Sequence, residues 1–233
     1  MRFRPILFIF LILVSGIFYY NLTGNVVIEK QEVFVFRVID GDTIQDRNGQ
    51  SYRFLGINTP EKNQLGYQEA KDFLKQYENK TIEIENHGYD KYGRFLVYAF
   101  YGNQFVNQEV LVRGLASLFY YDKDEYYAEM KNAEETARNK EIGIWKKSPN
   151  YGCIKILKFE PIDKTEKDNE TLVLDNLCGI NLGITIKDDA THIYNEEISG
   201  ESTLKMNFKN IFNDDGDSLY IYDSKGLILF YRY

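Results

Sequence analysis

Residues 32–147 combine strand-like and helix-like patterns of apolar positions. Short apolar or alternating segments bounded by Gly, Asn and Asp predict strands, and they lie at 33–39, just after Thr43, and at 51–56, 81–85 and 95–101. Apolar residues recur at helical spacing in three further segments, 68–77, 106–115 and 127–137. This order predicts an α+β fold, in which a small β-barrel carries the helices on its outside.

The pattern changes to strands alone in residues 152–233. Short apolar alternations separated by Asp, Asn and Gly turns lie at 154–159, 171–176, 182–186, 204–208, 218–222 and 226–231. Six or seven strands in about eighty residues predict an immunoglobulin-like β-sandwich. The chain is therefore expected to hold an α+β domain at 32–147 followed by an all-β domain at 152–233.

The N-terminus has the pattern of an export signal. Arg2 and Arg4 precede an apolar run over residues 5–20, and residues 21–31 form a linker. The run is short for a membrane span. It fits either an uncleaved anchor in the membrane or a signal peptide cleaved near Val14–Gly16. The positive start would keep this end in the cytoplasm and leave the rest outside.

Composition limits the kinds of site that this chain can build. Two histidines and two cysteines are too few for a histidine metal centre, a cysteine-rich zinc site or a disulfide scaffold. A metal would therefore be held mainly by oxygen, which favours calcium or magnesium. The net charge of −7 lacks the basic excess of proteins that coat nucleic acid, and residues 148–233 carry 15 acidic but only 9 basic side chains.

The two cysteines, Cys153 and Cys178, both fall in the predicted all-β domain. Outside the cytoplasm they could form a disulfide. The alternative is a pair of buried thiols, and the sequence alone leaves both open.

Oxygen-bearing side chains follow two neighbouring predicted strands. Asp40 and Asp42 flank a glycine at the end of one, and Asn58 and Glu61 flank Thr59-Pro60 at the end of the other. If these strands pair, the four side chains converge beside Arg53. Together with a second arginine, Arg94, such a group would suit phosphodiester hydrolysis. A hard cation and guanidiniums stabilise charge on phosphoryl oxygens, and a carboxylate activates or orients water.

The motifs that hold these residues occur in a known order. They are Val38–Thr43, Arg53–Glu61, Asp90–Arg94, Val106-Asn107 leading to Gly114–Ala116, and Ile144-Trp145. In this order the chain resembles the staphylococcal (micrococcal) thermonuclease family over about residues 32–147. The resemblance implies a five-stranded oligonucleotide-binding-type barrel with three helices and a calcium-dependent nuclease that acts on DNA and RNA.

The resemblance also implies roles for individual residues. Calcium would be held by Asp42, Asn58 and the backbone carbonyl of Thr59, and catalysis would rest on Arg53, Glu61 and Arg94. Lys91, Tyr92 and Tyr120 would contact the substrate, and Asp40 and Thr43 would shape the metal pocket. Asn58 departs from the aspartate of the best-known members. An amide oxygen can still coordinate calcium, but the site loses a charge, so we expect weaker calcium binding.

The all-β domain resembles the lamin-tail domain through Glu170–Asn176, Ile184–Asp188 and Asn213–Leu219. Within the last of these, the segment Asn213–Asp217 has a misplaced glycine and no closing glutamate for an EF-hand loop, which favours a turn.

The sequence therefore predicts an exported or membrane-anchored, calcium-dependent endonuclease of DNA, RNA or both. It would be a monomer, attached to the membrane through residues 5–20 if the segment is uncleaved. The alternative is a catalytically weakened barrel that only binds nucleic acid and carries an envelope-attachment domain. Such a degraded copy should have lost the arginines or the glutamate, yet Arg53, Glu61 and Arg94 are all present. The partner of the all-β domain is not predicted.

Overall fold

The computed structural model describes residues 29–120, 123–161, 170–190, 192–209, 211–212 and 217–233. The chain divides into two compact units, Met1–Lys30 and Gln31–Tyr233. The predicted export segment at 1–20, most of the linker at 21–31 and most of the predicted turn at Asn213–Asp217 lie outside the described residues. Among the helices of the described residues, none is long and apolar enough to cross a membrane.

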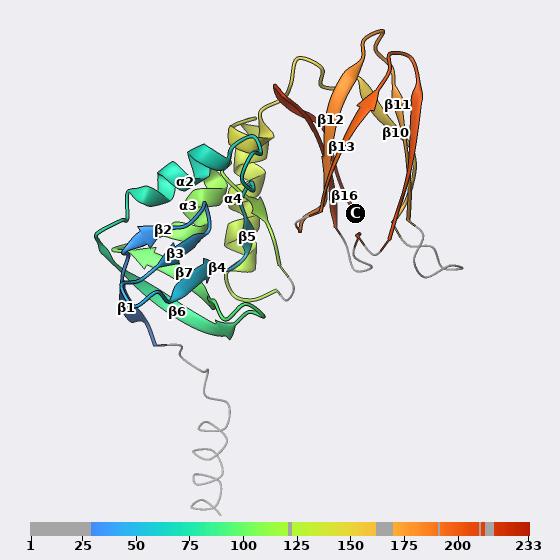
Figure 1. Cartoon of the computed structure of the whole chain (residues 1–233). Helices are drawn as coiled ribbons and strands as arrows, with labels where there is room; N and C mark the ends of the chain where they lie inside the picture. The colour runs from blue at the N-terminus through green and yellow to red at the C-terminus, as the bar shows by residue number, and fades with distance from the viewer. Residues whose placement is uncertain (1–28, 121–122, 162–169, 191, 210, 213–216) are drawn as a thin grey trace, which may run out of the picture. The chain divides into compact units, whose positions relative to one another are not determined.

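The first part of the chain, residues 31–145, forms a curled sheet covered by helices, and we call it the barrel (Figure 1). Its strands are β1 (Gln31–Phe34), β2 (Arg37–Val38), β3 (Thr43–Gln45), β4 (Ser51–Phe54), β6 (Thr81–Tyr89), β7 (Phe95–Tyr101) and β8 (Gln104–Phe105). They lie in the order β1-β6-β7-β4-β3-β2, with β8 on β7, and only the β4–β7 pair is parallel. The edge strands β1 and β2 are joined by only two residues, so the chain links the two edges of the sheet.

Three helices and a small second sheet complete the barrel. The helices are α2 (Tyr67–Lys75), α3 (Val106–Val112) and α4 (Tyr127–Asn139), and a 3₁₀ turn, η1, follows at Gly143–Trp145. Strand β5 (Ile57–Asn58) pairs with β9 (Ser117–Leu118) outside the main sheet. All three predicted helices are confirmed, and their apolar positions pack on the sheet with Leu74, Val110 and Met130 fully buried. The count of five strands stays a prediction.

The second part, residues 146–233, has strands and no helix among its described residues, as predicted, and we call it the β-region. One sheet has the order β10-β11-β14, from Ile154–Glu160, Glu170–Asn176 and Thr203–Phe208. The other has the order β13-β12-β15-β16, from Ile193–Ile198, Leu182–Lys187, Ser218–Asp223 and Gly226–Arg232. Side chains of both sheets share one core. The immunoglobulin-like and lamin-tail assignments stay predictions.

Strand β13 was not predicted, and its burial pattern explains why. It lies at the edge of its sheet, and the side chains of Asn195, Glu196 and Glu197 at its centre are exposed. No apolar alternation therefore marks it in the sequence.

The two cysteines form a disulfide, Cys153–Cys178, which resolves the alternative that the sequence left open. Cys153 precedes β10 and Cys178 follows β11, whose ends pair as Ile154 and Asn176. The bond closes a loop with a sequence separation of 25 residues. Loss of loop entropy in the unfolded chain makes such a bond worth about 3 kcal/mol.

The barrel and the β-region share a third apolar cluster, which includes Ala137 and Trp145 from the barrel and Tyr220 and Leu227 from the β-region. Trp145 is 1% exposed and packs edge-on against Phe230. Backbone hydrogen bonds from Ser148 N to Leu227 O and from Leu227 N to Lys146 O, both 2.9 Å, fix the segment that follows Trp145 to β16. The two parts therefore pack against each other through buried apolar and aromatic side chains.

A buried ion pair crosses the same junction. Arg232 on β16 binds Glu134 on α4 through two hydrogen bonds of 2.6 and 3.1 Å. The side chain of Glu134 is fully buried, and its Oε1 also accepts a 2.8 Å hydrogen bond from the backbone N of Leu118 on β9. Removing one member of such a pair leaves an uncompensated charge in the interior.

We expect Arg232→Ala to lower the free energy of unfolding by about 3 kcal/mol, because Glu134 would stay buried with only the guanidinium of Arg138, 3.8 Å away, to offset its charge. The free energy of unfolding is measured by urea denaturation, monitored through the fluorescence of Trp145, the single tryptophan, which lies at the junction. Arg113→Ala is the matched control, since the Arg113–Glu109 pair is exposed and should contribute less than about 0.5 kcal/mol. Equal effects of the two variants would show that the buried pair does not hold the junction.

Candidate active site

Asp42 lies at the centre of the candidate site, in the turn between β2 and β3, and is 5% exposed. Its Oδ2 accepts hydrogen bonds from the backbone N and the hydroxyl of Thr59, at 3.1 and 2.9 Å. Its Oδ1 accepts one from the hydroxyl of Thr43 at 3.0 Å. Burial raises the pKa of Asp42, but the charge of Arg53 and the hydrogen bonds outweigh it and hold that pKa below its ordinary value. A fixed, ionised carboxylate results.

Arg53 connects Asp42 with Asn58. It stands on β4 opposite Thr43, which brings its guanidinium next to the Asp42 turn. The guanidinium forms an ion pair with the Asp42 carboxylate and donates a 3.4 Å hydrogen bond to Asn58 Oδ1. Of the four side chains predicted to converge beside Arg53, Asp42 and Asn58 contact its guanidinium. One carboxylate oxygen and one neutral amide oxygen thus face the guanidinium of Arg53.

Asn58 on β5 also receives a contact that the sequence did not predict. Its Nδ2 donates hydrogen bonds to the backbone carbonyls of Asp189 and Ala190, at 2.9 and 2.8 Å, in the turn after β12. Two carbonyl acceptors require the NH2 group on that side, so the amide oxygen is turned toward Arg53. An aspartate would place a carboxylate oxygen against both carbonyls. The β-region therefore accounts for the asparagine physically.

Asp40 supports the turn instead of facing Arg53. Its Oδ1 accepts a 3.1 Å hydrogen bond from the backbone N of Asp42. Burial, followed by the nearby charge of Asp42, raises the pKa of Asp40 to about 7. Thr43 is buried and orients Asp42. Both residues thus contact Asp42, and their role in shaping a metal pocket stays a prediction.

The donors around Arg53 fit a hard cation. The carboxylate of Asp42 and the amide oxygen of Asn58 converge on one positive group, and the Thr59 backbone is fixed to Asp42. Oxygen donors of this kind suit calcium. In the described parts of the chain, no group of three or more His, Cys, Asp or Glu side chains could hold a metal ion. A cation here would depend on the mixed set of carboxylate, amide and backbone oxygens.

Glu61 and Arg94 stand apart from this cluster. Glu61 is exposed, and within the described residues it makes no hydrogen bond or ion pair with Asp42 or Arg53. Arg94 is held by Asp90 at the β6–β7 turn, with Nε 2.7 Å from the carboxylate. Arg53 pairs with Leu96 across β4 and β7, and Arg94 lies two residues before Leu96, directly ahead of β7. The two arginines therefore come from neighbouring stretches of the sheet.

The three predicted substrate contacts differ in their surroundings. Tyr92 is 72% exposed, and the Lys91 amine lies 5.1 Å from the centre of its ring. Tyr120 is half-buried, and its hydroxyl bonds to the hydroxyl of Tyr98 at 2.9 Å and to Asp124 at 3.2 Å. Lys91 and Tyr92 present a cation and an aromatic face to solvent. The ring of Tyr120 is tied into the barrel, and its predicted substrate contact stays a prediction.

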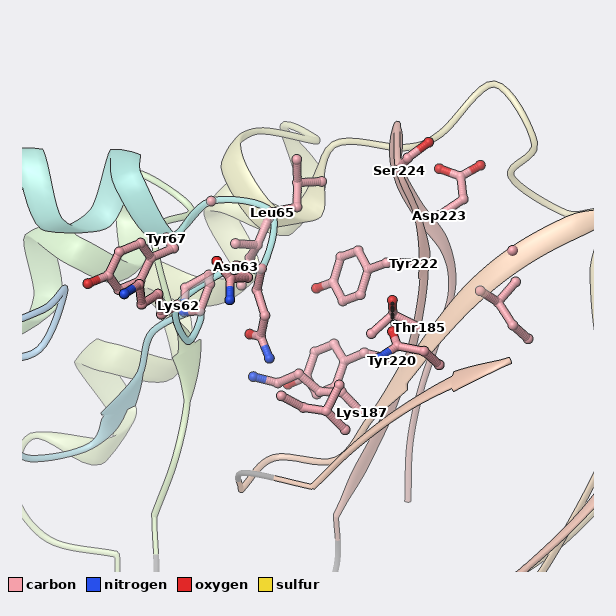
Figure 2. Close-up of a pocket in the computed structure, with 18 of the residues that line it drawn as sticks. Lys62, Asn63, Leu65, Tyr67, Thr185, Lys187, Tyr220, Tyr222, Asp223 and Ser224 are labelled. Carbon is pink, nitrogen blue, oxygen red and sulfur yellow. Dashed lines mark hydrogen bonds between the residues drawn. The ribbon is translucent and has the colours of Figure 1, made fainter. Parts of the chain in front are cut away.

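A cavity of about 1260 Å³ borders Asn58 and lies between the barrel and the β-region (Figure 2). Its walls include Asn58, Pro60 and Gln64 of the barrel and Lys187, Tyr220 and Tyr222 of the β-region. The sequence predicted no role for these residues of the β-region. Lys187 could have been noticed, because a lysine there follows the alternating buried residues of β12 and precedes two aspartates, Asp188 and Asp189.

Known proteins match the barrel sequence. Residues 51–147 match the family described as staphylococcal nuclease homologue. The thermonuclease of Staphylococcus intermedius is 33% identical over 133 residues, which cover 52% of this chain and 79% of that protein. The thermonuclease of Staphylococcus hyicus is 33% identical over 129 residues, covering 50% of this chain and 76% of that one.

A third relative comes from a different genus. An uncharacterized endonuclease of Haemophilus influenzae is 31% identical over 123 residues, which cover 50% of this chain and 67% of that protein. The motif order, the cluster around Arg53 and these relatives agree: the chain belongs to the staphylococcal nuclease homologue family.

Proposed function

We propose that this chain is a calcium-dependent endonuclease that hydrolyses phosphodiester bonds of DNA, RNA or both. The observation that carries the proposal is the contact of Arg53 with both Asp42 and Asn58 in a site built from oxygen donors. Thermonuclease and endonuclease relatives support a nuclease. The barrel supplies an exposed face with a second arginine and an aromatic ring beside it.

In this mechanism Asp42, the Asn58 amide oxygen and the Thr59 carbonyl would hold calcium, which when bound neutralises charge on the phosphoryl oxygens. Arg53 and Arg94 grip the non-bridging oxygens of the scissile phosphate through charge-assisted hydrogen bonds. The exposed carboxylate of Glu61 takes a proton from, or orients, the attacking water. The ring of Tyr92 packs against the nucleotide.

A catalytically weakened barrel that only binds nucleic acid is the alternative function. Arg53, Glu61 and Arg94 are all retained, and Asp42 is fixed in its ionised form. A barrel that only bound nucleic acid would not need this buried charge, which is costly unless paired. The retained set favours the enzyme.

We further propose that the chain works outside the cytoplasm, anchored through or released from residues 5–20, as a monomer. The Cys153–Cys178 disulfide supports this placement, because such bonds persist in oxidising compartments. The apolar run behind Arg2 and Arg4 has the pattern of an export signal. Protease added to intact cells should cut the chain, and full protection would contradict export.

The finer fold assignments are also proposals. A five-stranded barrel is supported by the linked edges of the main sheet. An immunoglobulin-like, lamin-tail-type sandwich is supported by two sheets around a shared core in the β-region. The excess of acidic over basic side chains in residues 148–233 argues against a broad nucleic-acid-binding surface on the β-region.

Removal of calcium tests the enzymatic proposal directly. Plasmid DNA incubated with the purified chain should be degraded in millimolar-range calcium and stay intact with chelator, because the donor set is oxygen only and one donor is neutral. Gel electrophoresis measures the loss of intact plasmid. Full activity in chelator would contradict the calcium site.

Arg53→Lys and Arg94→Lys should each lower the cleavage rate by orders of magnitude, about 100-fold or more. Lysine keeps the charge but loses the planar fork that grips a phosphate through two bonds. Initial rates on a fluorescent oligonucleotide provide the measurement. Arg37→Lys is the control, since Arg37 is exposed on β2 and binds Gln45. A rate within about threefold of the unmodified chain would remove that arginine from the mechanism.

Asn58→Asp should have two opposite effects. The added charge should tighten calcium binding. Without calcium the variant should lose about 1–3 kcal/mol of stability, because it gives up two hydrogen bonds to the carbonyls of Asp189 and Ala190.

Thermal denaturation in chelator and a calcium titration separate these two effects. Asn58→Ala is the control, because it removes the same donor without adding charge and should show only the stability loss. Unchanged stability of Asn58→Asp in chelator would show that the contact with the β-region contributes nothing.

A further inference from the structure

Lys187, the last residue of β12, is a buried cation without a direct partner. It is only 9% exposed, and within the described residues its amine makes no hydrogen bond or ion pair. The ring of Tyr220 lies 5.8 Å from the amine. Figure 2 shows the side chain reaching from β12 across the cavity toward the barrel segment that carries Lys62 and Asn63. Burial of an ammonium group is costly unless something compensates its charge.

The neighbouring carboxylates do not supply that partner. Asp188 is engaged by His192, and Asp189 accepts hydrogen bonds from Ser218 and Tyr220. Burial, the largest effect, lowers the pKa of Lys187, while the charges of Asp188, Asp189, Glu61 and Asp42 act in the opposite direction. The amine therefore lies close to the candidate active site and points into a cavity that Asn58 borders.

Gln64 adds a second donor on the opposite wall of the same cavity. Its Oε1 accepts a 2.9 Å hydrogen bond from the backbone N of Glu61, which fixes the amide so that Nε2 points away from Glu61. Nε2 is buried and has no hydrogen-bond partner in the described part of the chain. Unpaired buried donors are rare, and each one calls for an explanation such as a missing acceptor.

We propose that Lys187 and Gln64 form a second phosphate subsite, which holds a phosphate of the substrate strand next to the scissile one. This inference rests on the proposed nuclease function and names how the β-region takes part in it. A phosphate supplies several charged acceptor oxygens, which one ammonium and one amide NH2 can satisfy together. The cavity of about 1260 Å³ has room for a nucleotide.

The rest of the lining holds one more lysine, Lys62, together with carboxylates. Tyr222 offers an aromatic wall for a sugar or base. Asp223 is already engaged by Ser148 and Asn150, while Glu196 and Glu197 are exposed on β13 and would repel a run of phosphates. A small cationic site is compatible with the acidic excess of residues 148–233, because it does not require a broad basic surface.

The test compares two substrates in the full chain. One is a dinucleotide with a single phosphodiester and no other phosphate, and the other is a single-stranded oligonucleotide of about eight nucleotides, within the site sizes of single-strand binding proteins. Lys187→Met should raise KM for the oligonucleotide about tenfold, as expected for loss of one charge-assisted contact, and leave kcat within about twofold. KM for the dinucleotide should not change.

Two further variants sharpen this result. Lys205→Met is the matched control, because Lys205 is exposed on β14, outside the cavity, and loses the same charge. Gln64→Glu keeps the acceptor for Glu61 N but replaces the donor by a carboxylate, so it should also raise KM for the oligonucleotide alone. For Lys187→Met, the slope of the logarithm of the binding constant against the logarithm of the salt concentration should become shallower by about 0.7.

Oligonucleotide binding measured in chelator tests the subsite independently of cleavage, so its outcome can be told apart from that of the nuclease proposal. Fluorescence anisotropy of the intact oligonucleotide should show about tenfold weaker binding to Lys187→Met than to the unmodified chain or Lys205→Met. If the unmodified chain binds but never cleaves, the nuclease proposal fails while the subsite stands. If Lys187→Met and Gln64→Glu match the control on both substrates and in binding, or if they affect both substrates equally, the subsite is overturned.

Discussion

The buried carboxylate of Glu134 is the group on which the arrangement of the site depends. It accepts hydrogen bonds from Leu118 N on β9 and from Arg232 on β16, so one side chain fixes a strand of the barrel and a strand of the β-region. Strand β9 pairs with β5, which carries Asn58. Arg232 also contacts Tyr220, whose hydroxyl donates to Asp189 at 2.5 Å. The carbonyl of Asp189 then binds Asn58, which closes a ring of contacts through both parts.

This ring explains how a strand pair of only two residues on each side can hold a site residue in place. An isolated pair of that length has little stability of its own. Here β5 and β9 are held from one side by Glu134 and from the other by the turn after β12. Charges buried in this way are costly when one partner is lost, so the network specifies one relative placement of its members. The position of Asn58 is therefore a property of the whole unit from Gln31 to Tyr233.

Much of the barrel could be predicted from the sequence because its signals are local. Helical spacing identified all three helices, and the Asp-Gly-Asp and Asn-Thr-Pro-Glu turns predicted that Asp42 and Asn58 would meet beside Arg53. Contacts between the two parts were out of reach, since Asn58 and Asp189 are 131 residues apart and meet through backbone carbonyls. Because every residue has a backbone carbonyl, residue types do not reveal which carbonyl accepts such a hydrogen bond. Strand β13 was missed for a related reason, because its exposed polar centre hides the period of two.

The asparagine at position 58 shows how the two parts constrain each other. Considered within the barrel alone, the residue gives the cluster around Arg53 one negative charge fewer than an aspartate would. Considered with the β-region, its NH2 group is what allows the carbonyls of Asp189 and Ala190 to approach without repulsion. The same turn follows directly after Lys187, so the contact that removes a negative charge from the site also brings a positive one to its edge. The neutral side chain at position 58 and the lysine at the edge of the site thus follow from one packing arrangement.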